Sequence, residues 1–97
     1  MKCILLFLTL LFCSPTLADD SQVKVHVDQK VCQAKANYMA KHNVFDHYAP
    51  IVGWFEGIGY GSVPNCGTCT PSQQMRLTGD AVAKSASGAY YRVRSWR

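Results

Sequence analysis

The sequence has no apolar run long enough to cross a membrane, no cluster of basic residues and no glycine motif for a nucleotide cofactor. Its longest apolar run covers residues 3–12, whereas a membrane-spanning helix needs about 20 residues. Ten Lys and Arg are scattered among six Asp and Glu, which does not indicate a nucleic-acid partner. Gly57, Gly59 and Gly61 alternate and lack the G-x-G-x-x-G spacing. We therefore expect no cofactor of that kind.

The first eighteen residues have the pattern of an export signal. Lys2 precedes the apolar run, Pro15 interrupts it, and Thr16 and Ala18 are small residues at the positions that a signal peptidase reads. We expect cleavage after Ala18 and release into the extracellular or periplasmic space. Residues 19–97 would then form a single small domain of 79 residues with a net charge of +3, because Lys2 leaves with the signal.

Three cysteines remain after this cleavage, and an oxidising compartment favours their pairing. A bond between Cys66 and Cys69 would close a four-residue loop and contribute about 2 kcal/mol, whereas joining Cys32 to either partner would contribute about 4 kcal/mol. Both structural pairings stay open. Redox or zinc chemistry is less favoured, because the C-x-x-C segment lies between prolines in a predicted loop and no second close pair of Cys or His is present.

One helix is predicted over residues 28–42. Its apolar positions recur at intervals of four and three residues, namely Val27, Val31, Ala34 and Tyr38. Asp28 is a suitable N-cap, His42 is placed to interact with the dipole at the helix end, and Asn43 is a suitable left-handed stop. Residues 22–27 alternate between polar and apolar types, which predicts a short strand or an extended lead-in.

Residues 43–72 are rich in glycine, proline and aromatic side chains, and we expect them to be mostly loop. The most apolar part, residues 51–55, is predicted to fill space beneath the helix; a ligand pocket is the alternative. The C-terminal residues 75–84 and 89–96 flank the short loop 85–88, which ends in glycine and predicts a β-hairpin.

The register of this hairpin follows if Ser85 faces Ala89. Small residues then meet large ones on the core face, as Ala83 opposite Tyr91 and Ala81 opposite Val93. The outer face pairs Asp80 with Arg94 and Thr78 with Trp96, and it carries a row formed by Tyr90, Arg92, Arg94 and Trp96. We interpret this row as a solvated face, with a surface for polyanions or lipid headgroups as the alternative.

Several segments together resemble the CAP superfamily of cysteine-rich secretory proteins, antigen 5 and pathogenesis-related proteins. They are residues 34–40 (AKANYMA), His47, residues 55–62 (FEGIGYGS), residues 79–83 (GDAVA) and residues 90–93 (YYRV). The family's opening helix and its Ser-Gly-His segment have no counterpart. The resemblance therefore implies an α+β fold reduced from the family's α-β-α sandwich, with one principal helix on a small antiparallel sheet and a C-terminal hairpin.

The resemblance also implies a site. Two histidines and two acidic residues line the family's cleft, and His47 and Glu56 are the only counterparts here. We expect a structural hydrogen bond between them, with weak or absent metal affinity, in a monomeric, non-catalytic module that binds a lipid, glycan or protein. The alternative is a metal-assisted or acid-base hydrolase in which His47 and Glu56 act as catalytic groups or metal ligands.

Overall fold

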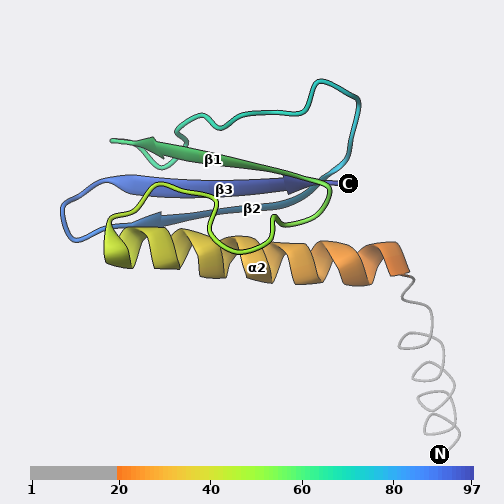
Figure 1. The fold of residues 1–97 in the computed structure, drawn as a ribbon, viewed down its shortest axis with the longest axis horizontal. Coiled ribbons are helices and arrows are strands. Elements are labelled where there is room, and N and C mark those ends of the chain that lie inside the picture. Colours follow the sequence, from red (N-terminus) through yellow and green to blue (C-terminus); the bar gives the residue numbers. More distant parts are fainter. Residues whose placement is uncertain (1–19) are drawn as a thin grey trace, which may run out of the picture.

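The computed structural model describes residues 20–97, so the predicted export signal and its cleavage site lie outside the described part. Helix α2 (Asp20–His42) is followed by strands β1 (Phe55–Gly61), β2 (Leu77–Lys84) and β3 (Tyr90–Trp96). The sheet has the order β1-β3-β2, and both strand pairs are antiparallel. Helix α2 packs on one face of this sheet (Figure 1). The predicted α+β class, with one principal helix on a small antiparallel sheet, is confirmed. Within residues 20–97, no helix meets the length and apolar character that crossing a bilayer requires.

The predicted end of the helix at His42 is confirmed, but its predicted start and its predicted apolar face are wrong. The helix begins at Asp20, so residues 22–27 are helical instead of extended. Its buried face is formed by Asp28, Cys32, Lys35, Ala36, Met39 and Ala40. The predicted apolar positions, Val27, Val31, Ala34 and Tyr38, are exposed. The helix therefore packs on the sheet with a different stripe from the one that carries its larger aliphatic residues, because tertiary packing outweighs local sequence preference.

Asp28 is a buried residue inside the helix and not its N-cap. Arg97 donates from Nε to Asp28 Oδ2 at 2.8 Å, and Thr78 donates from Oγ1 to the same oxygen at 2.7 Å. These donors compensate the burial of a carboxylate that would otherwise be costly. At the other end of the helix, Asn43 has φ 53°, as predicted for a left-handed stop, and the Val44 amide donates to the Met39 carbonyl.

The hairpin register is confirmed over most of its length. Ala83 pairs with Tyr91, Ala81 with Val93 and Asp80 with Arg94. Tyr91 and Val93 are buried against α2 together with Ala81. The predicted pairing of Thr78 with Trp96 is wrong, because a register shift between Leu77 and Gly79 places Leu77 opposite Trp96. This irregularity leaves Thr78 buried, where it reaches Asp28.

Two glutamines of α2 cover the free edge of β2. Gln29 donates from Nε2 to the Asp80 carbonyl and accepts from the Asp80 amide, at 3.0 and 2.8 Å. Gln33 donates to the Val82 carbonyl at 3.2 Å. Side chains of the helix therefore satisfy backbone groups that an unpaired edge strand would expose.

Strand β1 lies inside the segment predicted to be mostly loop. Its glycines Gly57, Gly59 and Gly61 point away from α2, opposite the face that carries Glu56. A methyl carbon added at Gly57 or Gly59 would overlap the carbonyl oxygen of Cys69 or Gly67. The absence of side chains on this face thus lets the 66–69 segment lie directly on the sheet. In Figure 1 the chain after β1 returns along that strand before it reaches β2.

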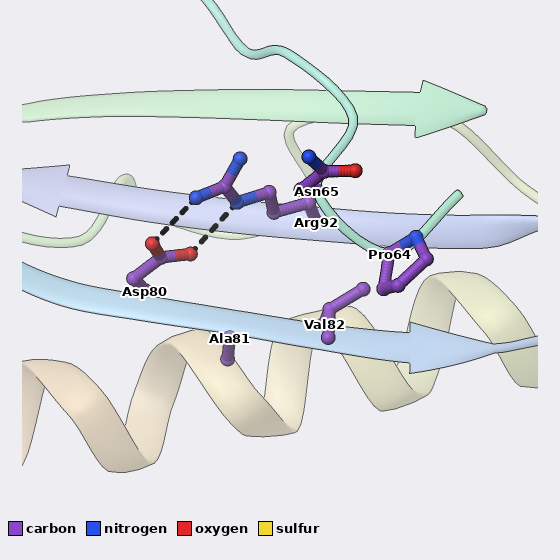
Figure 2. A pocket seen from close by; sticks show the side chains of 6 residues that line it. All are labelled: Pro64, Asn65, Asp80, Ala81, Val82 and Arg92. Carbon is purple, nitrogen blue, oxygen red and sulfur yellow. Dashed lines mark hydrogen bonds and ion pairs between the residues drawn. The ribbon is translucent and has the colours of Figure 1, made fainter. Parts of the chain in front are cut away.

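The outer row of β3 is consequently not a solvated face. Arg92 makes an ion pair with Asp80 at 2.6 Å and donates from Nη1 to the Cys66 carbonyl at 2.8 Å. Figure 2 shows the Arg92 guanidinium directed at the Asp80 carboxylate. Arg94 donates to Thr68 Oγ1 at 2.8 Å, and Trp96 is buried beside Phe55.

Candidate functional site

The centre of the candidate site is the carboxylate of Glu56, which β1 directs toward α2. Its side chain has no exposed surface. Lys35 from α2 donates from Nζ to Glu56 Oε1 at 2.6 Å and to the Pro50 carbonyl at 2.7 Å. The Val52 amide donates to the same Glu56 oxygen at 2.9 Å. The carboxylate therefore joins the helix to the chain that leads into β1.

His47 completes this arrangement, and its predicted hydrogen bond with Glu56 is confirmed. His47 Nδ1 lies 2.6 Å from Glu56 Oε2, and 44% of the histidine side chain is exposed. Because the partner is a carboxylate, the geometry favours a proton on Nδ1 and a lone pair on Nε2. The site consequently has a buried anion and a partly exposed imidazole that the anion orients.

Lys35 is the principal residue that sequence reasoning missed. It lies among the apolar residues of the buried helix face, three positions after Cys32 and four before Met39. A lysine in such a row is a signal for a buried acidic partner, because an unpaired ammonium group is costly to bury. Burial by itself would raise the pKa of Glu56, but the hydrogen bonds from Lys35, His47 and the Val52 amide lower that pKa below the ordinary value of 4.5.

Aromatic rings border the lysine. Tyr48 stacks on Tyr38 with ring centroids 4.1 Å apart, and the Lys35 ammonium group lies 5.6 Å from the centre of the Tyr48 ring. Burial, together with Tyr38 and Glu56, raises the pKa of Tyr48. The rings of His42 and Tyr38 also pack together, with their centroids 4.3 Å apart. These contacts hold the 43–50 segment against the last turns of α2.

The Glu56 oxygens are all engaged by donors of the protein. Oε1 accepts hydrogen bonds from Lys35 and from the Val52 amide, and Oε2 is hydrogen-bonded to His47 Nδ1. No group of three or more His, Cys, Asp or Glu side chains gathers within residues 20–97 in a geometry suited to a metal ion. The chemistry that this arrangement offers directly is acceptance of a proton at His47 Nε2.

The three cysteines of the described chain are free thiols. Cys32 faces Gly79 and Ser95 on the α2 side of the sheet, and its burial raises the pKa of the thiol. Cys66 lies over Gly61 on the opposite side, so the sheet separates it from Cys32. Neither long link can form in this arrangement.

The short link would require the loop to rearrange. The contacts of residues 66–69 with β1 and the lack of any turn within them indicate an extended backbone. An extended chain rises about 3.3 Å per residue, which places the Cα atoms of Cys66 and Cys69 about 10 Å apart. A disulfide needs less than about 7 Å. The Cys66–Cys69 bond therefore stays a prediction that this conformation does not contain.

A groove of about 430 Å³ lies between α2 and the 48–53 segment. Its apolar lining includes Val27, Val31, Ala34, Tyr48, Pro50 and Ile51. The prediction that residues 51–55 fill space beneath the helix holds for Val52, which is buried in the core. It fails for Ile51 and Trp54, which are more than half exposed. The chain thus leaves large apolar side chains at its surface beside the candidate site.

Comparison with known proteins finds no matching family model, no matching curated protein and no matching solved structure.

Proposed function

We propose that the protein is a secreted, non-catalytic binding module of the CAP type. The observation that carries this proposal is that both oxygens of Glu56 accept hydrogen bonds inside the protein, from Lys35, the Val52 amide and His47. A carboxylate that acts as a metal ligand or activates water needs a lone pair directed at that metal or water. Glu56 instead supports the fold, as expected for a family cleft that has lost half of its residues.

Binding is supported by the surface next to this site. The groove between α2 and the 48–53 segment combines apolar side chains with polar groups of Asp28, Lys35 and Arg97. A concave, largely apolar surface with a few polar groups is typical of ligand-binding sites. The chemical classes that fit it are a lipid, a glycan or a protein segment, and the protein would act as a monomer.

A hydrolase remains the second function, because one observation favours it. The imidazole of His47 is held at Nδ1 by a buried carboxylate while its ring is partly exposed, which is how a general base is oriented in many hydrolases. In this reading His47 Nε2 accepts the proton of an attacking water, and Glu56 stabilises the imidazolium ion that forms.

Titration calorimetry with zinc distinguishes the two functions. The binding module is expected to show no dissociation constant below about 1 μM. Tighter binding that disappears in both His47→Ala and Glu56→Gln would move the metal-assisted hydrolase to first place. Hydrolysis of an activated ester that is lost in His47→Ala, while Asp46→Ala retains it, would favour the metal-free form of that enzyme.

Export is tested by mass spectrometry of the protein recovered outside the cell. We expect Asp19 at its N-terminus, since cleavage is predicted after Ala18. Recovery of a chain that still begins with Met1 would overturn the secreted part of the proposal.

A further inference from the structure

Helix α2 carries a second apolar stripe that faces away from the sheet. Its members are Val23, Val27, Val31, Ala34 and Tyr38, which recur every three or four residues and are all exposed. The core uses a different stripe of the same helix, centred on Cys32, Ala36 and Met39. From Val23 to Tyr38 the outward stripe runs about 22 Å along the helix. Tyr38 stacks on Tyr48, but packing inside the protein leaves Val23, Val27 and Val31 largely uncovered.

The charged residues beside this stripe are cations. At 3.6 residues per turn, Lys30 and Lys41 fall on one side of the stripe and Lys24 on the other, and all three are exposed. The acidic residues of α2 are Asp20, at its first position, and Asp28, which is buried against Arg97. A linear apolar surface bordered by lysines is complementary to a partner that is apolar inside and anionic at its surface.

We propose that the outward stripe of α2 docks the protein onto the surface of an anionic phospholipid bilayer. The helix lies parallel to the membrane, with Val23, Val27 and Val31 among the upper acyl chains and Lys24, Lys30 and Lys41 at the phosphate groups. Ile51, which lines the groove beside Val27 and Val31, extends the inserted surface. This proposal deepens the binding function proposed above by naming its partner.

Charge and shape favour a bilayer over the other occupants of such a face. A second copy docked stripe to stripe would bring lysines of both helices close together along the stripe, and like charges repel one another. A protein partner would anchor a side chain in the groove beside Val27 and Val31, which leaves Val23 uncovered. A membrane interface covers the whole row from Val23 to Val31.

The test is sedimentation of the exported protein with vesicles. The vesicles contain phosphatidylcholine alone, or phosphatidylcholine with about one-third phosphatidylglycerol. We expect binding to the anionic vesicles at low salt that weakens strongly at about 0.5 M salt, where surface charges are screened. Binding to the neutral vesicles should be weak.

Two matched substitutions locate the surface. Val27→Asp and Val63→Asp make the same change at side chains that are 49% and 50% exposed, but Val63 lies in the segment between β1 and β2, away from α2. We expect Val27→Asp to weaken binding by tenfold or more, roughly the effect of losing one buried aliphatic side chain. Val63→Asp should stay within about threefold of the unchanged protein. Circular dichroism confirms that both variants are folded.

Lysine substitutions test the electrostatic part. Lys24→Gln and Lys30→Gln should each weaken binding about fivefold, whereas Lys84→Gln, at the end of β2, should have little effect. Equal effects of Val27→Asp and Val63→Asp, or equal binding to neutral and anionic vesicles, would overturn the proposal. A dimer in analytical ultracentrifugation that Val27→Asp converts to monomer, without vesicle binding, would assign the stripe to self-association. Loss of vesicle binding leaves the zinc result unchanged, so failure here is distinct from failure of the non-catalytic function.

Discussion

At the scale of single residues, the buried pair of Lys35 and Glu56 connects the fold and the site. Both side chains are almost fully enclosed, and their charged atoms are 2.6 Å apart. Such a pair adds modest net stability when intact, because desolvation opposes the attraction. Removal of one partner is different, since the other charge then remains buried without compensation.

Glu56→Gln is therefore expected to lower the free energy of unfolding by about 3 to 5 kcal/mol. The amide leaves the Lys35 ammonium group without an anion and also weakens the contact with His47. Urea denaturation followed by circular dichroism measures the change. His47→Gln is the control, because this side chain is 44% exposed and its loss should cost about 1 kcal/mol or less. Equal losses in the two variants would contradict a dominant role for Lys35.

The site could be predicted from the sequence only in part. His47 and Glu56 are nine positions apart, and their contact was predicted from the sequence. Lys35 and Arg97 were not, because each pairs with an acidic residue far away in the sequence. Lysine and arginine are usually solvated, and sequence periodicity does not reveal the exceptions that tertiary contacts create.

At the scale of elements, α2 shows why periodicity gave the wrong face. Two stripes of the helix have apolar members, and the stripe with larger aliphatic residues, including Val27 and Val31, faces outward. The buried stripe contains the charged residues Asp28 and Lys35, so the sequence pattern did not identify it as the core face. The hairpin was predictable because both strands are local, with a glycine at the turn, Gly88, that has φ 94°.

Substitutions on the two faces of the hairpin should affect stability to different extents. Tyr91→Ala should destabilise the protein by about 3 kcal/mol or more, because it removes an aromatic ring from the core. Arg92→Ala, on the outer face, would cost little if that face were solvated. Its contacts with Asp80 and the Cys66 carbonyl instead predict a loss of about 1 to 2 kcal/mol. Thermal unfolding ranks the variants, and a larger loss for Arg92→Ala would contradict the assignment of faces.

Strand β1 escaped prediction because alternate glycines usually indicate a loop. Here Gly57, Gly59 and Gly61 remove the side chains from one face of a strand, and the 66–69 segment takes their place. Glycine by itself weakens a strand, so the local sequence does not predict β1. The glycines are there because another segment packs on that face of the strand.

A pair of glycine substitutions tests this contact. Gly59→Ala should lower stability by about 2 kcal/mol or more, because the added methyl carbon overlaps the Gly67 carbonyl. Gly67→Ala should change stability by less than about 0.5 kcal/mol, since a methyl carbon there meets no atom within 4 Å. Thermal melts measure both. Faster reaction of the Cys66 thiol with a thiol reagent in Gly59→Ala alone would show that the segment has left the sheet.

At the scale of the whole molecule, two buried carboxylates fasten the helix to distant parts of the chain. Asp28 binds Thr78 of β2 and the C-terminal Arg97, and Glu56 of β1 binds Lys35. The stability of the entire domain is consequently linked to the ionisation of both groups.

The fold should therefore lose stability on acidification. Burial alone would raise the pKa of Asp28, but hydrogen bonds from Arg97 and Thr78 lower this pKa below 3.8. Burial would likewise raise the pKa of Glu56, but hydrogen bonds from Lys35 and His47 lower it below 4.5. The unfolded chain thus binds these protons at a higher pH than the folded protein does. The stabilisation that the two ionised carboxylates contribute is fully present above about pH 5 and is lost as the pH falls through the lowered pKa values.

Urea denaturation between about pH 7 and pH 2 should show a falling free energy of unfolding below about pH 4.5, with a shallower fall in Asp28→Asn. A free energy that stays constant or rises over this range would contradict the ionised state of both carboxylates in the folded protein.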